Sequence, residues 1–159
     1  MKYPLKVLAL LTPLLVVLDQ WTKFLVVKHL ALGESVTVIP GYFDWVHVRN
    51  TGAAFGLLAR SPEGFRVPFF YGISFVAVAA LIYGYWKIKN SERFLSYPLA
   101  LITAGVLGNL IDRFHYGNVV DFVSWHIQDR FVWPAFNVAD SAITISMFLL
   151  FISVLKSDR

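Results

Sequence analysis

The chain has 159 residues, of which 57% are hydrophobic and only 15% are charged. Its mean hydropathy is +0.62, whereas soluble domains are roughly half apolar and a quarter charged. This composition excludes an ordinary soluble domain and predicts a single integral membrane domain over residues 1–159. The formal charge of +4 comes without a basic run or a basic face interleaved with aromatic residues, so we expect no nucleic-acid partner. The absence of cysteine excludes a disulfide, a thiol nucleophile and a cysteine metal site.

The first apolar segment, "MKYPLKVLALLTPLLVVLDQ", begins with basic residues as a signal peptide does. No small-x-small cleavage site follows it and the apolar pattern resumes in "FLVVKHLAL", which predicts a retained helix over about 4–30. Further apolar stretches of about 20 residues predict helices over 66–87, 96–115 and 137–156. Because helices are the open-ended structures that satisfy every backbone group in lipid, we expect an all-α membrane protein with four transmembrane helices.

Two longer connections, 31–65 and 116–136, join these helices. In the first, β-branched and aromatic residues alternate and are interrupted by Pro40 and Gly41, which predicts a small sheet on the membrane surface. The second contains Trp125 and other aromatic residues, which predict an interfacial loop or a short helix.

Basic residues predict the orientation. Half of them fall in the short segments 1–6, 87–93 and 156–159. By the positive-inside rule both termini are then cytoplasmic, and the connections 31–65 and 116–136 are extracytoplasmic.

Polar residues of the predicted helices share one depth in the membrane. At 1.5 Å per residue, Asp19 lies about 20 Å beyond the inner end of the first helix. The other polar residues at this depth lie near the outer ends of the third and fourth helices. They are Asn109, Asp112, Arg113, Asn137 and Asp140. Asp121 follows the third helix and can fold back to the same level. Intramembrane ionisable groups usually face the bundle interior and mark function.

Each of these residues also has a structural explanation. Asp19 and Lys23 are spaced i,i+4 and can pair with each other, and either Asp112 or Asp121 can pair with Arg113.

At the fourth helix, Asn137 can cap the helix and Asp140 can interact with its positive N-terminal dipole. We expect this explanation to account for one of the two residues and not for both. The histidines have no metal-ligand spacing such as H-E-x-x-H, so we expect no metal site.

Two aspartates that face each other have a specific chemistry. Like charges in close contact cannot both ionise, so one carboxyl keeps its proton while the other acts as a base. Asp121 and Asp140 are the best candidates, because one follows a helix and the other begins a helix at the same membrane surface.

Five segments in order resemble the lipoprotein signal peptidases, also called signal peptidase II. They are "DQWTK" (19–23), "NTGAAFG" (50–56), "GNLIDR" (108–113), "VVDF" (119–122) and "FNVAD" (136–140).

The resemblance implies a four-helix aspartyl endopeptidase of the bacterial cytoplasmic (inner) membrane. Such an enzyme cuts the signal peptide from a prolipoprotein immediately before a diacylglyceryl-modified cysteine, and needs no cofactor or metal. It implies that Asp121 and Asp140 are catalytic. It also implies residues that bind substrate or support the aspartates: Asn50, Asn109, Arg113, Asn137, Asp19 and Gly52. Glycines at 52 and 56 would let the sheet approach the substrate closely. We expect a monomer whose partners are prolipoproteins and membrane phospholipids.

Two alternatives remain open from the residues themselves. The same carboxylates could serve a small non-enzymatic transporter or lipid-binding protein. They could also serve a protease that cuts within a transmembrane helix, although such enzymes usually hold both aspartates inside helices and Asp121 follows one.

Overall fold

A computed structural model describes residues 2–52, 57–88, 93–128 and 130–157. The helices are α1 (Tyr3–His29), α2 (Glu63–Lys87), α3 (Ser96–Tyr116) and α4 (Val138–Ser157), with a 3-10 turn, η2, at Arg93–Leu95. The strands are β1 (Ser35–Ile39), β2 (Phe43–Asn50), β3 (Val119–Ile127) and β4 (Phe131–Val132). Each predicted helix agrees with an observed one to within a turn at both ends.

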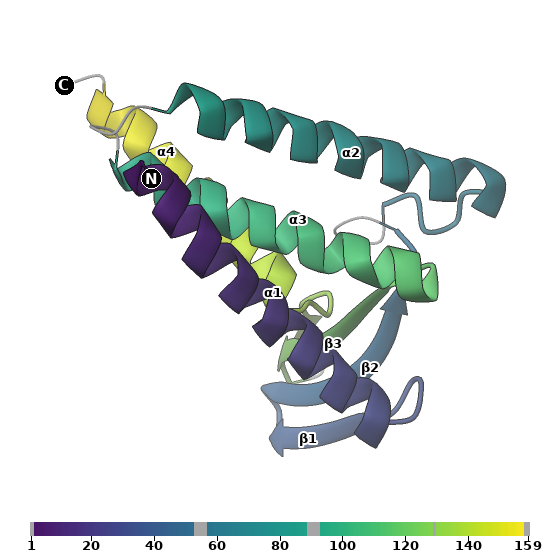
Figure 1. The fold of residues 1–159 in the computed structure, drawn as a ribbon. Coiled ribbons are helices and arrows are strands. Elements are labelled where there is room, and N and C mark those ends of the chain that lie inside the picture. Colours follow the sequence, from purple (N-terminus) through teal and green to yellow (C-terminus); the bar gives the residue numbers. More distant parts are fainter. Residues whose placement is uncertain (1, 53–56, 89–92, 129, 158–159) are drawn as a thin grey trace.

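The helices form the larger part of the molecule, and α3 lies among the other three (Figure 1). Both termini lie at one end of the helices, and the sheet lies at the other end. In the described part of the chain, α1, α2 and the segment Arg93–Tyr116 are long and apolar enough to cross a membrane, whereas α4 has a shorter apolar stretch. The protein is therefore a helical membrane protein with a small antiparallel sheet.

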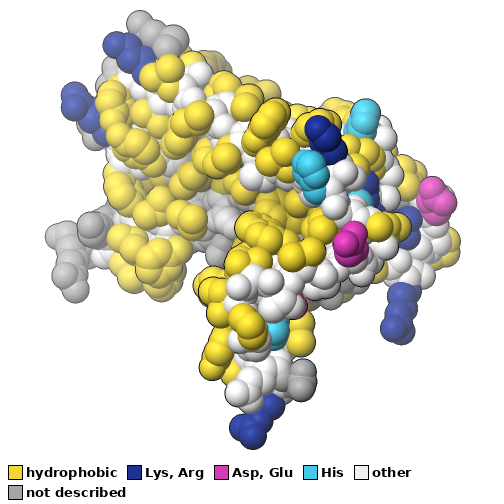
Figure 2. Space-filling model, turned by 90° about the horizontal axis from the view of Figure 1, so that it is seen from below, with side chains coloured by type: hydrophobic (Ala, Val, Ile, Leu, Met, Phe, Trp, Pro, Cys, Tyr) yellow, Lys and Arg dark blue, Asp and Glu magenta, His cyan; other side chains and the backbone are white. Residues whose placement is uncertain are grey.

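Much of the helical surface is apolar. Figure 2 shows hydrophobic side chains over a large area of one face, with Lys and Arg side chains at its edges. On α1, for example, Leu10, Leu14 and Val17 are exposed. Continuous exposed apolar surface of this extent is unusual in a soluble monomer and suits contact with lipid.

Small residues bring α3 against α4. A Cβ added to Gly105 would lie 2.5 Å from the Ala139 carbonyl oxygen, and one added to Gly108 would lie 3.2 Å from the Ala139 Cβ. Side chains at these positions would separate the helices, so glycine permits the close approach that is common between membrane helices. The close contact places the start of α4 beside the polar C-terminal part of α3.

The sheet combines both long connections in the order β1-β2-β3-β4. β2 and β3 are antiparallel, and Val48 lies opposite Asp121. The expectation of a loop or short helix in 116–136 is therefore wrong over the strands Val119–Ile127 and Phe131–Val132. The segment Val119–Ile127 is rich in β-branched and aromatic residues, and its first four residues are all buried. A strand covered on both faces shows no alternation of polar and apolar residues, so its local pattern did not predict it.

Candidate active site

β3 and α4 bring Asp121 and Asp140 to the same residue, Asn137. The Asn137 Nδ2 donates to Asp121 Oδ1 at 2.7 Å, and the Asn137 backbone N–H donates to Asp140 Oδ2 at 3.3 Å. Asn137 is completely buried and precedes α4 directly. The predicted pair of aspartates is thus assembled around one buried asparagine.

Asn109, on α3, joins this group from the opposite side. Its Nδ2 donates to Asp140 Oδ1 at 2.8 Å, and its Oδ1 accepts from the Asn137 Nδ2 at 3.2 Å. The same oxygen accepts from the Lys23 ammonium at 3.1 Å. Asn109 and Asn137, two of the three asparagines predicted to bind substrate or support the aspartates, therefore hydrogen-bond to them directly.

The start of α4 is a reciprocal cap. The Asn137 Oδ1 accepts from the Asp140 N–H at 2.9 Å, while Asp140 Oδ2 accepts from the Asn137 N–H. This is the capping-box arrangement, in which the two residues satisfy each other's backbone donors. The expectation that capping accounts for only one of them is wrong. The cap uses one oxygen of Asp140, and its other oxygen is held by Asn109.

Asp121 is 2% exposed. Burial and, to a smaller extent, the nearby charge of Asp140 raise the pKa of its carboxyl to about 7. Hydrogen bonds from Asn50 and Asn137 and the positive charge of Lys23 act in the opposite direction on this pKa. Near neutral pH this carboxyl can therefore both release and accept a proton, which is the property that a general acid or base requires.

Arg113 and Gly52 lie beside the aspartates. The Arg113 guanidinium donates to the Gly52 carbonyl oxygen at 3.3 Å and to the Asn109 carbonyl oxygen at 3.4 Å. Asn50 Oδ1 accepts from the Gly52 N–H at 2.9 Å. A Cβ on Gly52 would collide with the Leu57 carbonyl oxygen. The contact with Leu57 is therefore sufficient to explain glycine at position 52, without a contact to substrate. Residue 56, where a similar role was expected, lies outside the described residues.

The ion pairs differ in part from expectation. The predicted pair of Asp19 and Lys23 is confirmed, with 2.8 Å between Lys23 Nζ and Asp19 Oδ2. Asp112 was expected as one possible partner of Arg113, but it pairs with Lys23 at 3.0 Å. The sequence analysis missed Lys23 as a site residue. Its i,i+4 spacing from Asp19 was a signal, but it carried no information about contacts to α3.

In the part of the chain that the structure describes, no group of three or more His, Cys, Asp or Glu side chains could hold a metal ion. The donors to Asp121 and Asp140 include the side-chain amides of Asn109 and Asn137 and the Asn137 backbone N–H.

Comparison with known proteins decides the family. The family described as "Signal peptidase (SPase) II" matches residues 11–156. The "Lipoprotein signal peptidase" of Syntrophus aciditrophicus is 41% identical over 159 residues, which cover 100% of this chain and 98% of the relative. That of Desulforapulum autotrophicum is 46% identical over 140 residues, 88% and 86% of the two chains. A solved structure of a bacterial membrane enzyme superposes with a TM-score of 0.87 at 35% identity, covering 99% of this chain and 92% of the other.

The chain belongs to the signal peptidase II family. As a signal peptidase II it is a membrane-bound aspartic protease that acts on peptide bonds. The matches do not favour the non-enzymatic transporter or lipid-binding alternative. The two carboxyl groups that hydrogen-bond to Asn137 are the candidates for the catalytic pair of such a protease.

The raised pKa of Asp121 predicts a pH-dependent difference between the signal peptidase II and its Asp121→Asn variant. A carboxyl whose pKa is raised by folding stabilises the fold fully below its unfolded value near 4, and this stability is lost as the pH rises through about 7. The amide in the Asp121→Asn variant does not ionise, so the variant does not lose this stability as the pH rises. The variant should therefore gain stability relative to the wild type between pH 4 and 7, by at most about 4 kcal/mol at about 1.4 kcal/mol per pKa unit.

Thermal unfolding of both proteins in detergent micelles across this pH range measures the difference. A difference in stability between the two proteins that stays the same at every pH would contradict the raised pKa.

Proposed function

We propose that this signal peptidase II cuts diacylglyceryl-modified prolipoproteins immediately before the lipidated cysteine, with Asp121 and Asp140 as its catalytic pair. Removal of signal peptides from prolipoproteins is the activity of the family to which the chain belongs. The observation that carries the assignment of residues is the pair of carboxyl groups held by one buried asparagine, Asn137. Both carboxyl groups come from one chain, which suits a monomer.

The chemistry requires one proton between the two carboxyl groups. The ionised carboxylate takes a proton from a water molecule, whose oxygen attacks the scissile carbonyl carbon. The partner carboxylic acid then gives its proton to the leaving nitrogen as the carbon–nitrogen bond breaks. Two like charges at close range oppose simultaneous ionisation, which keeps the pair in this singly protonated state.

Arg113 and Asn50 are proposed to bind the extended substrate backbone. A peptide entering a water-poor site must find partners for its N–H and C=O groups, because leaving them unpaired is costly. The Arg113 guanidinium has five N–H donors, and its contacts to Gly52 and Asn109 are long. It can therefore turn a donor toward a substrate carbonyl at little cost.

The proposed topology has four spans, cytoplasmic termini and an extracytoplasmic sheet and active site. α4 has 20 residues, and a helix of that length reaches about 30 Å, the thickness of a bilayer core. Both termini lie at the helix ends opposite the sheet (Figure 1), as an even number of crossings requires. Lys2 and Lys87 lie near those ends, as the positive-inside rule predicts for the cytoplasmic face.

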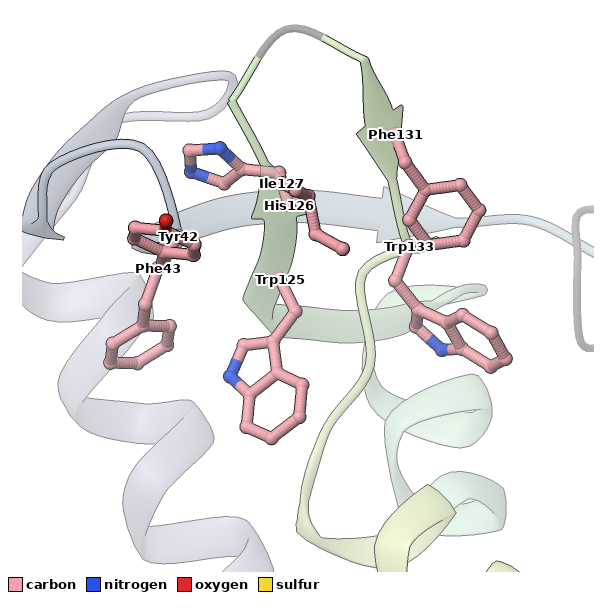
Figure 3. A pocket seen from close by; sticks show the side chains of 7 residues that line it. All are labelled: Tyr42, Phe43, Trp125, His126, Ile127, Phe131 and Trp133. Atoms are coloured by element: carbon pink, nitrogen blue, oxygen red, sulfur yellow. The ribbon is translucent and has the colours of Figure 1, made fainter.

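An aromatic pocket in the sheet is proposed to face the outer membrane interface and its phospholipids (Figure 3). It has a volume of about 340 Å³ and is lined by Tyr42, Phe43, Trp125, His126, Ile127, Phe131 and Trp133. Trp125 is 62% exposed, and Trp and Tyr side chains are enriched where the bilayer meets water. Asp121 and Trp125 occupy alternate positions of β3 and so share one face of the strand. A substrate held in lipid at this pocket would lie on the same side of β3 as the catalytic pair.

Separate Asp121→Asn and Asp140→Asn variants should each lose essentially all cleavage, because an amide cannot take up or release the proton. The measurement is the cleavage of a purified prolipoprotein, offered before and after diacylglyceryl transfer, by enzyme in detergent micelles. Wild-type enzyme should cut the lipidated form only.

Glu63→Gln is the matched control, since Glu63 is an exposed carboxylate in the first turn of α2. This variant should retain activity. Substantial cleavage by either the Asp121 or the Asp140 variant would refute the catalytic pair, and equal cleavage of both precursor forms would refute the lipid requirement.

The proposed orientation can be tested with single cysteines, since the chain contains none. Thr37→Cys, on the exposed strand β1, should react with a membrane-impermeable maleimide on intact spheroplasts. Lys2→Cys should react only after the membrane is permeabilised. The opposite pattern of labelling would place the sheet and the active site on the cytoplasmic side.

A further inference from the structure

A buried ion cluster lies directly behind the catalytic pair. Its members, Asp19, Gln20, Lys23 and Asp112, are here called the Lys23 cluster. The Lys23 ammonium lies 2.8 Å from Asp19 Oδ2 and 3.0 Å from Asp112 Oδ2. All three charged side chains are at most 3% exposed. The cluster therefore joins α1 to α3 in the interior of the bundle.

Each carboxylate of the Lys23 cluster also holds the backbone next to a catalytic aspartate. Asp112 Oδ2 accepts from the Val120 N–H at 2.9 Å, one residue before Asp121. Asp19 Oδ1 accepts from the Ala139 N–H at 2.9 Å, one residue before Asp140. The same ammonium thus links the two segments that carry the catalytic side chains.

The remaining hydrogen bonds close the cluster. The third contact of the Lys23 ammonium is to Asn109 Oδ1 at 3.1 Å, and Asn109 in turn binds Asp140. Gln20 Nε2 donates to Asp112 Oδ1 at 2.9 Å and to Asp19 Oδ2 at 3.1 Å. An ammonium has three N–H donors. Here each donor has an acceptor, and each acceptor residue also hydrogen-bonds to a segment that carries a catalytic aspartate.

We propose that Lys23 is a positioning residue for the peptidase reaction: through Asp112 and Asp19 it fixes the separation of the segments that carry Asp121 and Asp140. The inference rests on the proposed function and names a further residue on which that function depends. Stability alone does not explain such a cluster, because buried ion pairs often stabilise a fold less than apolar packing of the same volume would. A cluster with two carboxylates and one ammonium also retains a net negative charge, which adds to the cost of burial.

The ammonium has an electrostatic effect as well as a geometric one. Its charge lowers the pKa of Asp121 against the effect of burial. The other groups that act on Asp121 are Asp140 from α4, Arg113 from α3, and the Asn50 and Asn137 side chains. Removal of the Lys23 charge should therefore raise the pKa of Asp121, whereas a purely structural role would leave that pKa unchanged.

Lys23→Met is the principal test, because it removes the charge and nearly preserves the length of the side chain. We expect kcat toward a lipidated prolipoprotein to fall about 100-fold, as for a small misplacement of reacting groups, with KM within about threefold of wild type. The pH profile of kcat/KM should move to higher pH, because loss of the ammonium favours the protonated form of Asp121. Lys28→Met is the control on the same helix, since Lys28 is exposed and lies over the Phe24 ring. It should behave as wild type.

Lys23→Met leaves two buried carboxylates without a cation and can fail to fold, so Lys23→Met/Asp112→Asn is made alongside it. This double variant keeps the net charge of the cluster, and we expect it to fold, as judged by thermal unfolding, while kcat still falls at least about tenfold. A folded double variant with wild-type kcat would overturn the proposal. So would a Lys23→Met enzyme whose loss of activity matches its loss of folded protein and whose pH profile of kcat/KM does not move. Failure of the wild type and Lys28→Met to cut the lipidated precursor would refute the proposed function instead.

Discussion

The burial of acidic side chains around one ammonium is the constraint on which this structure depends. Asp19, Asp112 and Asp121 are all at most 2% exposed, and Lys23 contacts the first two directly. A carboxylate in such surroundings must find donors or keep its proton. Asp19 and Asp112 find an ammonium and backbone N–H groups, whereas Asp121 receives neutral amides and has its pKa raised by burial. The carboxylates of the Lys23 cluster therefore differ in their donors from Asp121, which is proposed to be catalytic.

The fold arranges these donors on elements that are far apart in the chain. α3 contributes Asn109 and packs against the other helices, and its glycines at 105 and 108 let α4 approach closely. A Cβ on Gly108 would also lie 2.6 Å from Asp19 Oδ2, so the same small residue makes room for the ion cluster. Asp121 lies on β3, in the sheet, and reaches this group of donors through its hydrogen bond with Asn137. Helix packing and the polar site therefore depend on some of the same residues of α3.

The sequence was informative where the signal is local. Helix bounds follow from apolar runs of bilayer length, and depth along those helices placed Asp140 at the level of Asn109, while Asp121 was expected to fold back to that level. It was uninformative where the decisive contact joins distant segments. The strand Val119–Ile127 pairs with β2, some 70 residues earlier, and its buried faces show no alternating pattern. The contact of Lys23 with Asp112 depends on the rotation of α1 against α3, which the spacing of residues within one helix does not reveal.

The central claim is that Asp121 and Asp140 share one proton at neutral pH. Infrared spectroscopy of the enzyme with isotope-labelled aspartate tests it most directly, because a protonated carboxyl has a carbonyl stretch distinct from that of a carboxylate. The account predicts such a band at neutral pH in the wild type, and its loss when Asp121 and Asp140 are both replaced by asparagine. A wild-type spectrum with every aspartate ionised at neutral pH would contradict it.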